Sequence, residues 1–158
     1  MILLVEDNED DVFLMQRALK LAGIGNPLHV VEDGEQAINF LGRKNEYAGR
    51  EEHLDPLIVF LDLKMPRKSG FDVLKWLREQ SDLPQPHVVV LSSSNAPQDW
   101  ERVKELGATT YAIKPPTPEL FSKLSTMLNL QWQPRPKPAV PAELLAIRSP
   151  QVQRQPQF

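Results

Sequence analysis

Polar side chains with complementary chemistry follow four short apolar runs of this sequence. In chain order, the runs are Ile2–Val5, Leu57–Leu61, Val88–Leu91 and Tyr111–Ile113. The side chains that follow them are Glu6 and Asp7, then Asp62, then Ser92, Ser93 and Ser94, and finally Lys114. If these groups meet, three carboxylates repel one another unless a cation lies among them. Mg²⁺ or Mn²⁺ fits this requirement, because both ions prefer oxygen ligands.

A carboxylate beside such an ion and a lysine is suited to accept a phosphoryl group. The ion and the lysine would neutralise the charge on the transferring oxygens, so the protein need only position the reacting groups. A serine hydroxyl could then hydrogen-bond a phosphoryl oxygen. Each group alone has an ordinary explanation, since an acid at a strand end is commonly solvated and Asp7 could cap the next helix. The prediction depends on all four strand ends together.

These groups meet only if the apolar runs are parallel strands of one sheet. The runs are almost continuously apolar, as expected when both faces of a sheet are covered, and Leu28–Val31 is a weaker fifth strand. Helical periodicity separates the strands, with the faces Val12, Met15, Leu19 and Ala22; Phe71, Leu74 and Leu77; and Leu120, Leu124, Met127 and Leu128. Two further helices are Glu35–Leu41, after the Asp33-Gly34 turn, and one with Val103 and Leu106 that stops at Gly107.

The resulting pattern of five β–α units predicts an α/β fold. Five units are too few for an eight-stranded barrel, so an open, doubly wound parallel sheet is favoured. Ligands bind such sheets beyond the carboxyl ends of the strands. The fold would therefore bring the polar groups of the four runs together.

Composition and charge exclude several classes of protein. The 158 residues contain no Cys, which excludes disulfides, thiol catalysis and Cys-based metal sites. The formal net charge of −3 argues against a nucleic-acid partner. No apolar run exceeds five residues, which is too short to span a membrane, and the start lacks the basic segment of a signal peptide. We therefore expect a soluble, cytoplasmic protein.

Residues 131–158 differ in composition from residues 1–130. They hold 6 of the 15 prolines and no glycine, and their net charge is +3, from Arg135, Lys137, Arg148 and Arg154 against Glu143. The stretch 133–141 favours extended polyproline geometry, which buries nothing by itself. We predict one domain over residues 1–130 and a Pro-rich basic tail without an output domain over residues 131–158. Deletion of residues 133–158 should then leave the stability of the domain nearly unchanged.

In this order and register, the motifs resemble those of bacterial two-component receiver domains over about residues 1–130. The stretch Met-Pro-Arg-Lys-Ser-Gly (65–70) resembles the loop of the family after its acceptor aspartate, and Leu-Gly-Ala (106–108) also fits. The resemblance implies a (βα)₅ flavodoxin-like sandwich with the strand order 2-1-3-4-5. It also implies Mg²⁺ or Mn²⁺ as the cofactor.

The resemblance also implies a role for each site residue. Those that handle the phosphoryl group are Asp62 as the acceptor, Lys114 as its binding group, Ser92 as the switch hydroxyl, Tyr111 as the switch aromatic, and Pro115, whose bond to Lys114 is typically cis. The metal would be bound directly by Asp7, Asp62 and the backbone carbonyl of Lys64, and by Glu6 through water.

Some features depart from the common pattern of the family. Glu6-Asp7 replaces a commoner Asp pair, Ser92 replaces a commoner Thr, and Pro116 extends the Lys-Pro motif. The stretch Arg43–Asp55 is longer and more charged than usual. With the loop after Asp62, this stretch resembles the single-domain receivers that pair with cyanobacterial and bacterial phytochrome kinases.

The implied function is that of a stand-alone response regulator. A sensor histidine kinase, which the resemblance implies to be of phytochrome type, would phosphorylate Asp62 in a His-Asp phosphorelay. The output would be a changed surface formed by the fourth helix, the fifth strand and the fifth helix. This surface would bind protein partners or a second copy of the chain. As a catalyst, the chain would do no more than phosphorylate itself from small donors and dephosphorylate itself.

Two alternatives involve other classes of protein. A receiver-like adaptor would bind partners without a phosphorylation cycle. A phosphatase of the haloacid dehalogenase class needs a second Asp two residues after its nucleophile, where this chain has Lys64.

Two tryptophans are each open to two interpretations. Trp100 joins the core or contacts a partner, and Trp132 packs back on the domain or contacts a partner.

Overall fold

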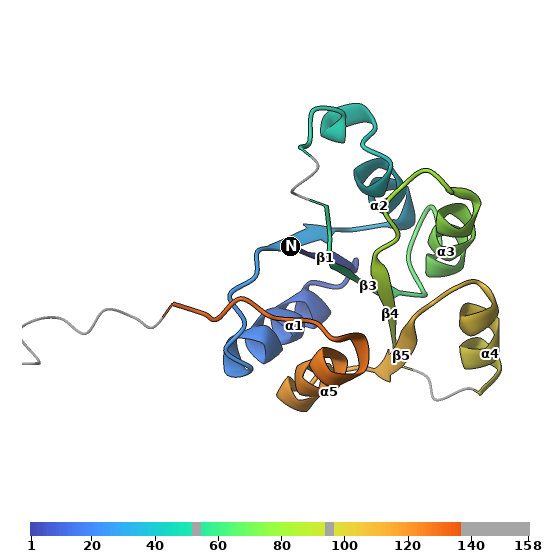
Figure 1. Ribbon diagram of the computed structural model, residues 1–158. Helices are drawn as coiled ribbons and strands as arrows, with labels where there is room; N and C mark the ends of the chain where they lie inside the picture. Colours follow the sequence, from blue (N-terminus) through green and yellow to red (C-terminus); the bar gives the residue numbers. More distant parts are fainter. Residues whose placement is uncertain (52–54, 94–96, 137–158) are drawn as a thin grey trace, which may run out of the picture.

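In the described part of the chain, five parallel strands form one central sheet (Figure 1). The computed structural model describes residues 1–51, 55–93 and 97–136. The strands are β1 (Ile2–Val5), β2 (Leu28–Val31), β3 (Ile58–Asp62), β4 (His87–Ser92) and β5 (Thr110–Ile113). Their spatial order is β2-β1-β3-β4-β5, so the predicted doubly wound topology is confirmed.

The described ranges also contain five α-helices and one short 3₁₀ helix, and all but the last α-helix lie between strands. They are α1 (Glu9–Leu21), α2 (Gly34–Leu41), η1 (Asn45–Tyr47), α3 (Gly70–Glu79), α4 (Pro97–Glu105) and α5 (Pro118–Leu128). Helices α1 and α5 cover one face of the sheet, and α2, α3 and α4 cover the other (Figure 1). None of the helices in the described ranges is long and apolar enough to cross a membrane.

Two buried clusters fill the space between the sheet and its two helical layers. In β1, Ile2 and Leu4 join the cluster under α1 and α5, whereas Leu3 and Val5 join the cluster under the other helices. Successive side chains of a strand point to opposite faces, so a strand covered on both faces must be apolar at every position. This is why the strands appear in the sequence as continuous apolar runs.

Side-chain caps begin three of the helices in the described ranges, namely α1, α2 and α3. Asn8 accepts a hydrogen bond from the backbone N–H of Asp11 (3.1 Å), and Asp33 accepts one from Gln36 (2.8 Å). Ser69 and Asp72 form a capping box at the start of α3. Such caps satisfy backbone donors that have no partner inside the helix. They fix where each helix begins relative to the residues that follow β1, β2 and β3.

The buried face of α5 differs from the predicted one at Met127. That side chain is 55% exposed, and Phe121 and Leu124 are the buried residues of the helix. The ring of Phe121 packs edge-on against Phe60 of β3, with 5.9 Å between ring centroids. Both sets of residues have helical spacing, and burial of the larger aromatic ring turns Met127 toward solvent.

The chain after α5 runs back along the domain past the end of α1 (orange in Figure 1). Trp132 packs edge-on against Phe121 and donates its indole N–H to the carbonyl of Phe121 (3.1 Å). Farther on, Gly25 donates to the carbonyl of Gln133, and Arg135 donates to that of Gly23, both at 2.7 Å. Trp132 therefore packs back on the domain, and the attached chain continues past residue 130. Residues 137–158 of the predicted tail lie outside the described ranges.

Candidate functional site

The carboxyl ends of β1, β3 and β4 and the loop after β5 bring the predicted side chains together. Asp62 and Ser92 are the last residues of β3 and β4, and both are buried, as is Glu6 after β1. One carboxylate oxygen from each of Glu6, Asp7 and Asp62 lies within 4.8 Å of the others. Asp7 is exposed, so the cluster opens to solvent on that side.

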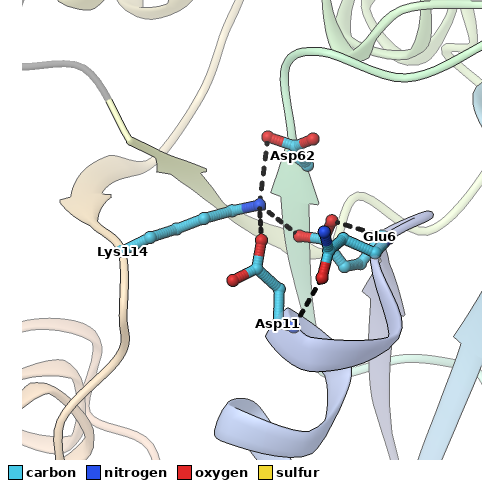
Figure 2. A network of polar contacts seen from close by, with 5 residues as sticks. Glu6, Asp11, Asp62 and Lys114 are labelled. Atoms are coloured by element: carbon cyan, nitrogen blue, oxygen red, sulfur yellow. Dashed lines mark hydrogen bonds and ion pairs between the residues drawn. The ribbon is translucent and has the colours of Figure 1, made fainter.

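The ammonium group of Lys114 lies among these carboxylates (Figure 2). Its Nζ is 2.5 Å from Oε2 of Glu6, 2.8 Å from Oδ2 of Asp11 and 3.5 Å from Oδ1 of Asp62. Lys114 reaches the site from the loop after β5, so its contacts with Glu6 and Asp11 join residues more than one hundred positions apart. The site therefore depends on the tertiary fold.

Asp11 is a site residue that the sequence did not indicate. It lies in the first turn of α1, within the acidic run Glu-Asp-Asn-Glu-Asp-Asp (6–11). Acids in the first turn of a helix are favourable near its positive end and need no further function. The sequence gives no signal that separates Asp11 from Glu9 and Asp10 in the same turn.

Burial and the Lys114 ammonium group have opposite effects on the pKa values of the buried carboxyls. Burial raises the pKa of the Asp62 and Glu6 carboxyls, and Lys114 counteracts part of that rise. Burial also acts to lower the pKa of Lys114, but hydrogen bonds to Asp11 and Glu6 outweigh it, and the pKa is raised. Lys114 is therefore a permanent cation at neutral pH.

The loop between β3 and α3, residues 63–69, is tied to the turn after β2. Asp33 is fully buried, caps α2 and accepts hydrogen bonds from the guanidinium of Arg67, including one of 2.7 Å from Nε. Burial acts to raise the pKa of Asp33, but Arg67 and the helix amides hold it below its usual range. Gly34 also donates to the carbonyl of Lys68 (3.1 Å). This loop contains Lys64, whose carbonyl is the predicted metal ligand.

The other residues with predicted roles lie in β4, in β5 and in the loop after β5. The backbone N–H of Lys114 donates to the carbonyl of Ser92 (2.9 Å), which links the ends of β4 and β5. Tyr111 is half-buried and packs edge-on against Trp100, with 5.8 Å between ring centroids. Trp100 itself packs partly buried against the core. The Lys114–Pro115 peptide bond is cis. Ser93 is exposed, and Ser94 is outside the described residues.

A parallel α/β sheet with an acidic cluster and a lysine at its carboxyl edge is the arrangement of a phosphoacceptor signalling domain. Residues 2–125 match the family model of the response regulator receiver domain, and the chain belongs to this family. It is thus a protein of two-component signalling.

Relatives within the family include single response regulators of similar length. The response regulator Rcp1 of Synechocystis sp. is 37% identical over 113 residues, which make up 72% of this chain and 75% of Rcp1. The structure of Rcp1 in an Mn²⁺-bound form has a TM-score of 0.68 at 31% identity and covers 84% of this chain and 97% of that one.

Two further solved structures are similar over most of the chain. The bacteriophytochrome response regulator RtBRR has a TM-score of 0.74 at 35% identity, with coverage of 93% of this chain and 87% of RtBRR. The phosphorylated cyanobacterial phytochrome response regulator RcpA has a TM-score of 0.69 at 31% identity, with coverage of 83% and 96%.

Proposed function

We propose that this chain is a stand-alone response regulator that accepts a phosphoryl group on Asp62 from a sensor histidine kinase. The observation that carries the proposal is the position of Asp62. It ends the central strand β3, belongs to the three-carboxylate cluster, and has the Lys114 ammonium 3.5 Å from Oδ1. RcpA, a structural relative, is a phosphorylated response regulator. The place of action would be the cytoplasm.

In the proposed transfer, a carboxylate oxygen of Asp62 attacks the phosphorus of a phosphohistidine. The new O–P bond forms as the N–P bond breaks, and the electron pair of that bond stays on the imidazole nitrogen, which takes up a proton. Lys114 donates a hydrogen bond to a phosphoryl oxygen and offsets its charge. Asp62 needs no general base, because a carboxylate is already ionised at neutral pH.

The acidic cluster fits a divalent cation. Three carboxylate oxygens within 4.8 Å of one another need positive charge, and only one ammonium group lies among them in the described structure. Asp7, Asp62 and the carbonyl of Lys64 would hold Mg²⁺ or Mn²⁺, with Glu6 acting through water. When bound, the ion would supply further positive charge for the phosphoryl oxygens. Mn²⁺ binding by the relative Rcp1 supports this assignment.

The proposed kinase is of phytochrome type, as the names of the relatives suggest. Ion pairs join described residues of the charged stretch after α2, which is longer than usual for a receiver. Arg43 and Arg50 both form ion pairs with Asp55, and the guanidinium of Arg50 lies 4.2 Å from the ring centroid of Phe40. Residues 52–54 within this stretch are outside the described ranges.

The proposed output surface includes β5 and α5. Ile113 and Met127 are exposed there, and a groove of about 410 Å³ runs between the two elements. Exposed apolar side chains beside a groove are suited to a protein partner, including a second copy of the chain. A phosphorylation-dependent homodimer through this face is part of the proposal.

Labelling with acetyl phosphate and Mg²⁺ tests the proposed acceptor. Mass spectrometry should show the gain of one phosphoryl group in the wild-type protein and none in Asp62→Asn. The control is Asp82→Asn, which removes the same charge at an exposed loop position and should label normally. Urea unfolding checks that both variants fold. Unchanged labelling of Asp62→Asn would refute the assignment, and an unlabelled wild type would favour the adaptor alternative.

A further inference from the structure

Lys114 is held closer to the first turn of α1 than to the proposed acceptor. Its Nζ is within hydrogen-bond distance of Asp11 and Glu6, at 2.8 and 2.5 Å, whereas Oδ1 of Asp62 is 3.5 Å away. Figure 2 shows the Asp11 carboxylate reaching from α1 toward this nitrogen. The acidic cluster and the proposed phosphoryl transfer do not by themselves require Asp11.

We propose that Asp11 is a positioning residue that holds Lys114 before phosphorylation and releases it when the phosphoryl group arrives. This inference rests on the proposed function. It means that Asp11 opposes occupation of the site, so that the resting state is favoured over the phosphorylated one.

The number of hydrogen-bond donors on Lys114 makes a release necessary. An ammonium group has three donors. In the resting site, they face three carboxylates, those of Glu6, Asp11 and Asp62. A phosphoryl group on Asp62 adds oxygens that carry nearly two negative charges at neutral pH. If Lys114 donates a hydrogen bond to one of these oxygens, its hydrogen bond to at least one of the three carboxylates must weaken or break.

The exposure of the two close partners decides which of them gives way. The Glu6 side chain is 2% exposed, so an unpaired Glu6 carboxylate would be left without water. The Asp11 side chain is 30% exposed, so water can replace the ammonium group. Releasing Asp11 is therefore the less costly change.

Loss of the Asp11 charge should make the site easier to occupy. The probe is beryllofluoride, a tetrahedral mimic of a phosphoryl group on a carboxylate, titrated at saturating Mg²⁺ and followed by NMR. For Asp11→Asn, we expect the beryllofluoride concentration at half-occupancy to fall about fivefold, the scale of a partly exposed ion pair. Asp11→Glu, which keeps the charge, should lie closer to the wild type.

Asp10→Asn is the matched control for net charge. Asp10 is exposed in the same turn of α1, and no ion pair with Lys114 is found for it in the described chain. The ¹⁵N signal of the Lys114 side chain should shift in resting Asp11→Asn, as it does when beryllofluoride enters the wild type, and should not shift in Asp10→Asn. Merely structural damage at Asp11 would not produce this pair of shifts.

Three outcomes would overturn the inference. An equal gain in Asp10→Asn and Asp11→Asn would mean that only net charge matters. Weaker binding by Asp11→Asn would mean that Asp11 holds Lys114 ready for the phosphoryl group. An unchanged midpoint for Asp11→Asn would mean that Asp11 does not oppose occupation. Failure of the proposed function is a separate result, because the wild type itself would then bind no beryllofluoride at Asp62.

Discussion

At the scale of single residues, the site is built around one cation that does not titrate at neutral pH. The pKa of Lys114 is raised by its carboxylate partners, so the side chain keeps its charge throughout the physiological range. A change of charge on Lys114 therefore takes no part in a response at this site, whereas movement of its ammonium group between partners can. Ser92 and Asp11 are the neighbours through which such a movement could be sensed or opposed.

Ser92 should separate capture of the phosphoryl group from the response to it. Capture uses the Asp62 carboxylate and Lys114, so Ser92→Ala should still be labelled by acetyl phosphate, although more slowly. A hydrogen bond to a charged oxygen is worth about 1.5–3 kcal/mol, so its loss should weaken the shift toward the active state by roughly tenfold or more. The measurements are Tyr111 ring shifts by NMR and dimerisation by sedimentation.

The matched control is Ser93→Ala, since Ser93 is exposed next to the buried Ser92. It should label and respond normally. If Ser92→Ala labels and dimerises like the wild type, the coupling runs through another group, and Ser93 or Ser94 becomes the next candidate.

His29 should make the protein less stable as the pH falls below the ordinary histidine pKa of about 6.5. It lies on the edge strand β2, stacked on Phe40 with 4.5 Å between ring centroids. Burial and the charge of Arg50 lower the pKa of His29 in the folded state. The unfolded chain therefore binds the proton more readily, and this contribution to stability is present above the unfolded pKa and lost as pH falls through the folded one.

Urea unfolding at several pH values tests this dependence on His29. The free energy of unfolding should fall more steeply toward pH 5.5 in the wild type than in His29→Gln. Taking the difference between the two proteins removes contributions from other groups, such as the amino terminus and the buried acids. Equal slopes would show that His29 is not the group responsible.

At the scale of elements, the start of α3 holds the loop that follows Asp62. Gly70, the first residue of α3, donates its backbone N–H to the carbonyl of Leu63 (3.1 Å). A Cβ on Gly70 would overlap the carbonyl oxygen of Asp62, which is backbone and cannot turn away. The lack of a side chain here lets the helix approach the acceptor strand.

Gly70→Ala should therefore disturb both the fold and the site. Overpacking of this kind costs about 1–3 kcal/mol, and we expect a loss of that size in urea unfolding. Labelling by acetyl phosphate should also slow, because the backbone of Asp62 has to shift. Gly49→Ala is the control, since a Cβ there would meet no atom within 4 Å. Equal stability of the two variants would contradict this account of the α3 start.

At the scale of the whole molecule, the segment after α5 joins the last helix to the first helix–strand turn. Pro134 forms an isolated antiparallel bridge with Ile24. The backbone N–H of Gln133 donates to Oδ1 of Asn26 (2.7 Å), in addition to the two backbone bonds with Gly23 and Gly25. These contacts change what is expected when the tail is removed.

Two truncations should differ in stability. From composition alone, deletion of residues 133–158 was expected to leave stability nearly unchanged. The three hydrogen bonds instead predict a loss of about 1–3 kcal/mol in urea unfolding. Deletion of residues 137–158 keeps these bonds and serves as the control, with wild-type stability. If both truncated proteins unfold like the full chain, the segment adds nothing to the domain.

Much of the fold follows from the sequence because its signals are local. Each apolar run and each helical period reports on residues next to one another, and burial of both sheet faces makes the strands easy to find. The positions of Glu6, Asp7, Asp62, Ser92 and Lys114 at strand ends also follow from the sequence, since parallel strands share one carboxyl edge. Their chemical roles remain predictions.

Only the tertiary structure decided which of several equivalent side chains make contact. Five acids lie between residues 6 and 11, and the approach of Lys114 from the far end of the chain selects Glu6 and Asp11 as its closest partners. In the same way, packing of Phe121 against Phe60 turned Met127 outward. Such contacts join segments that are far apart in the sequence. Local patterns of residue types do not show which of these segments will lie close together in the fold.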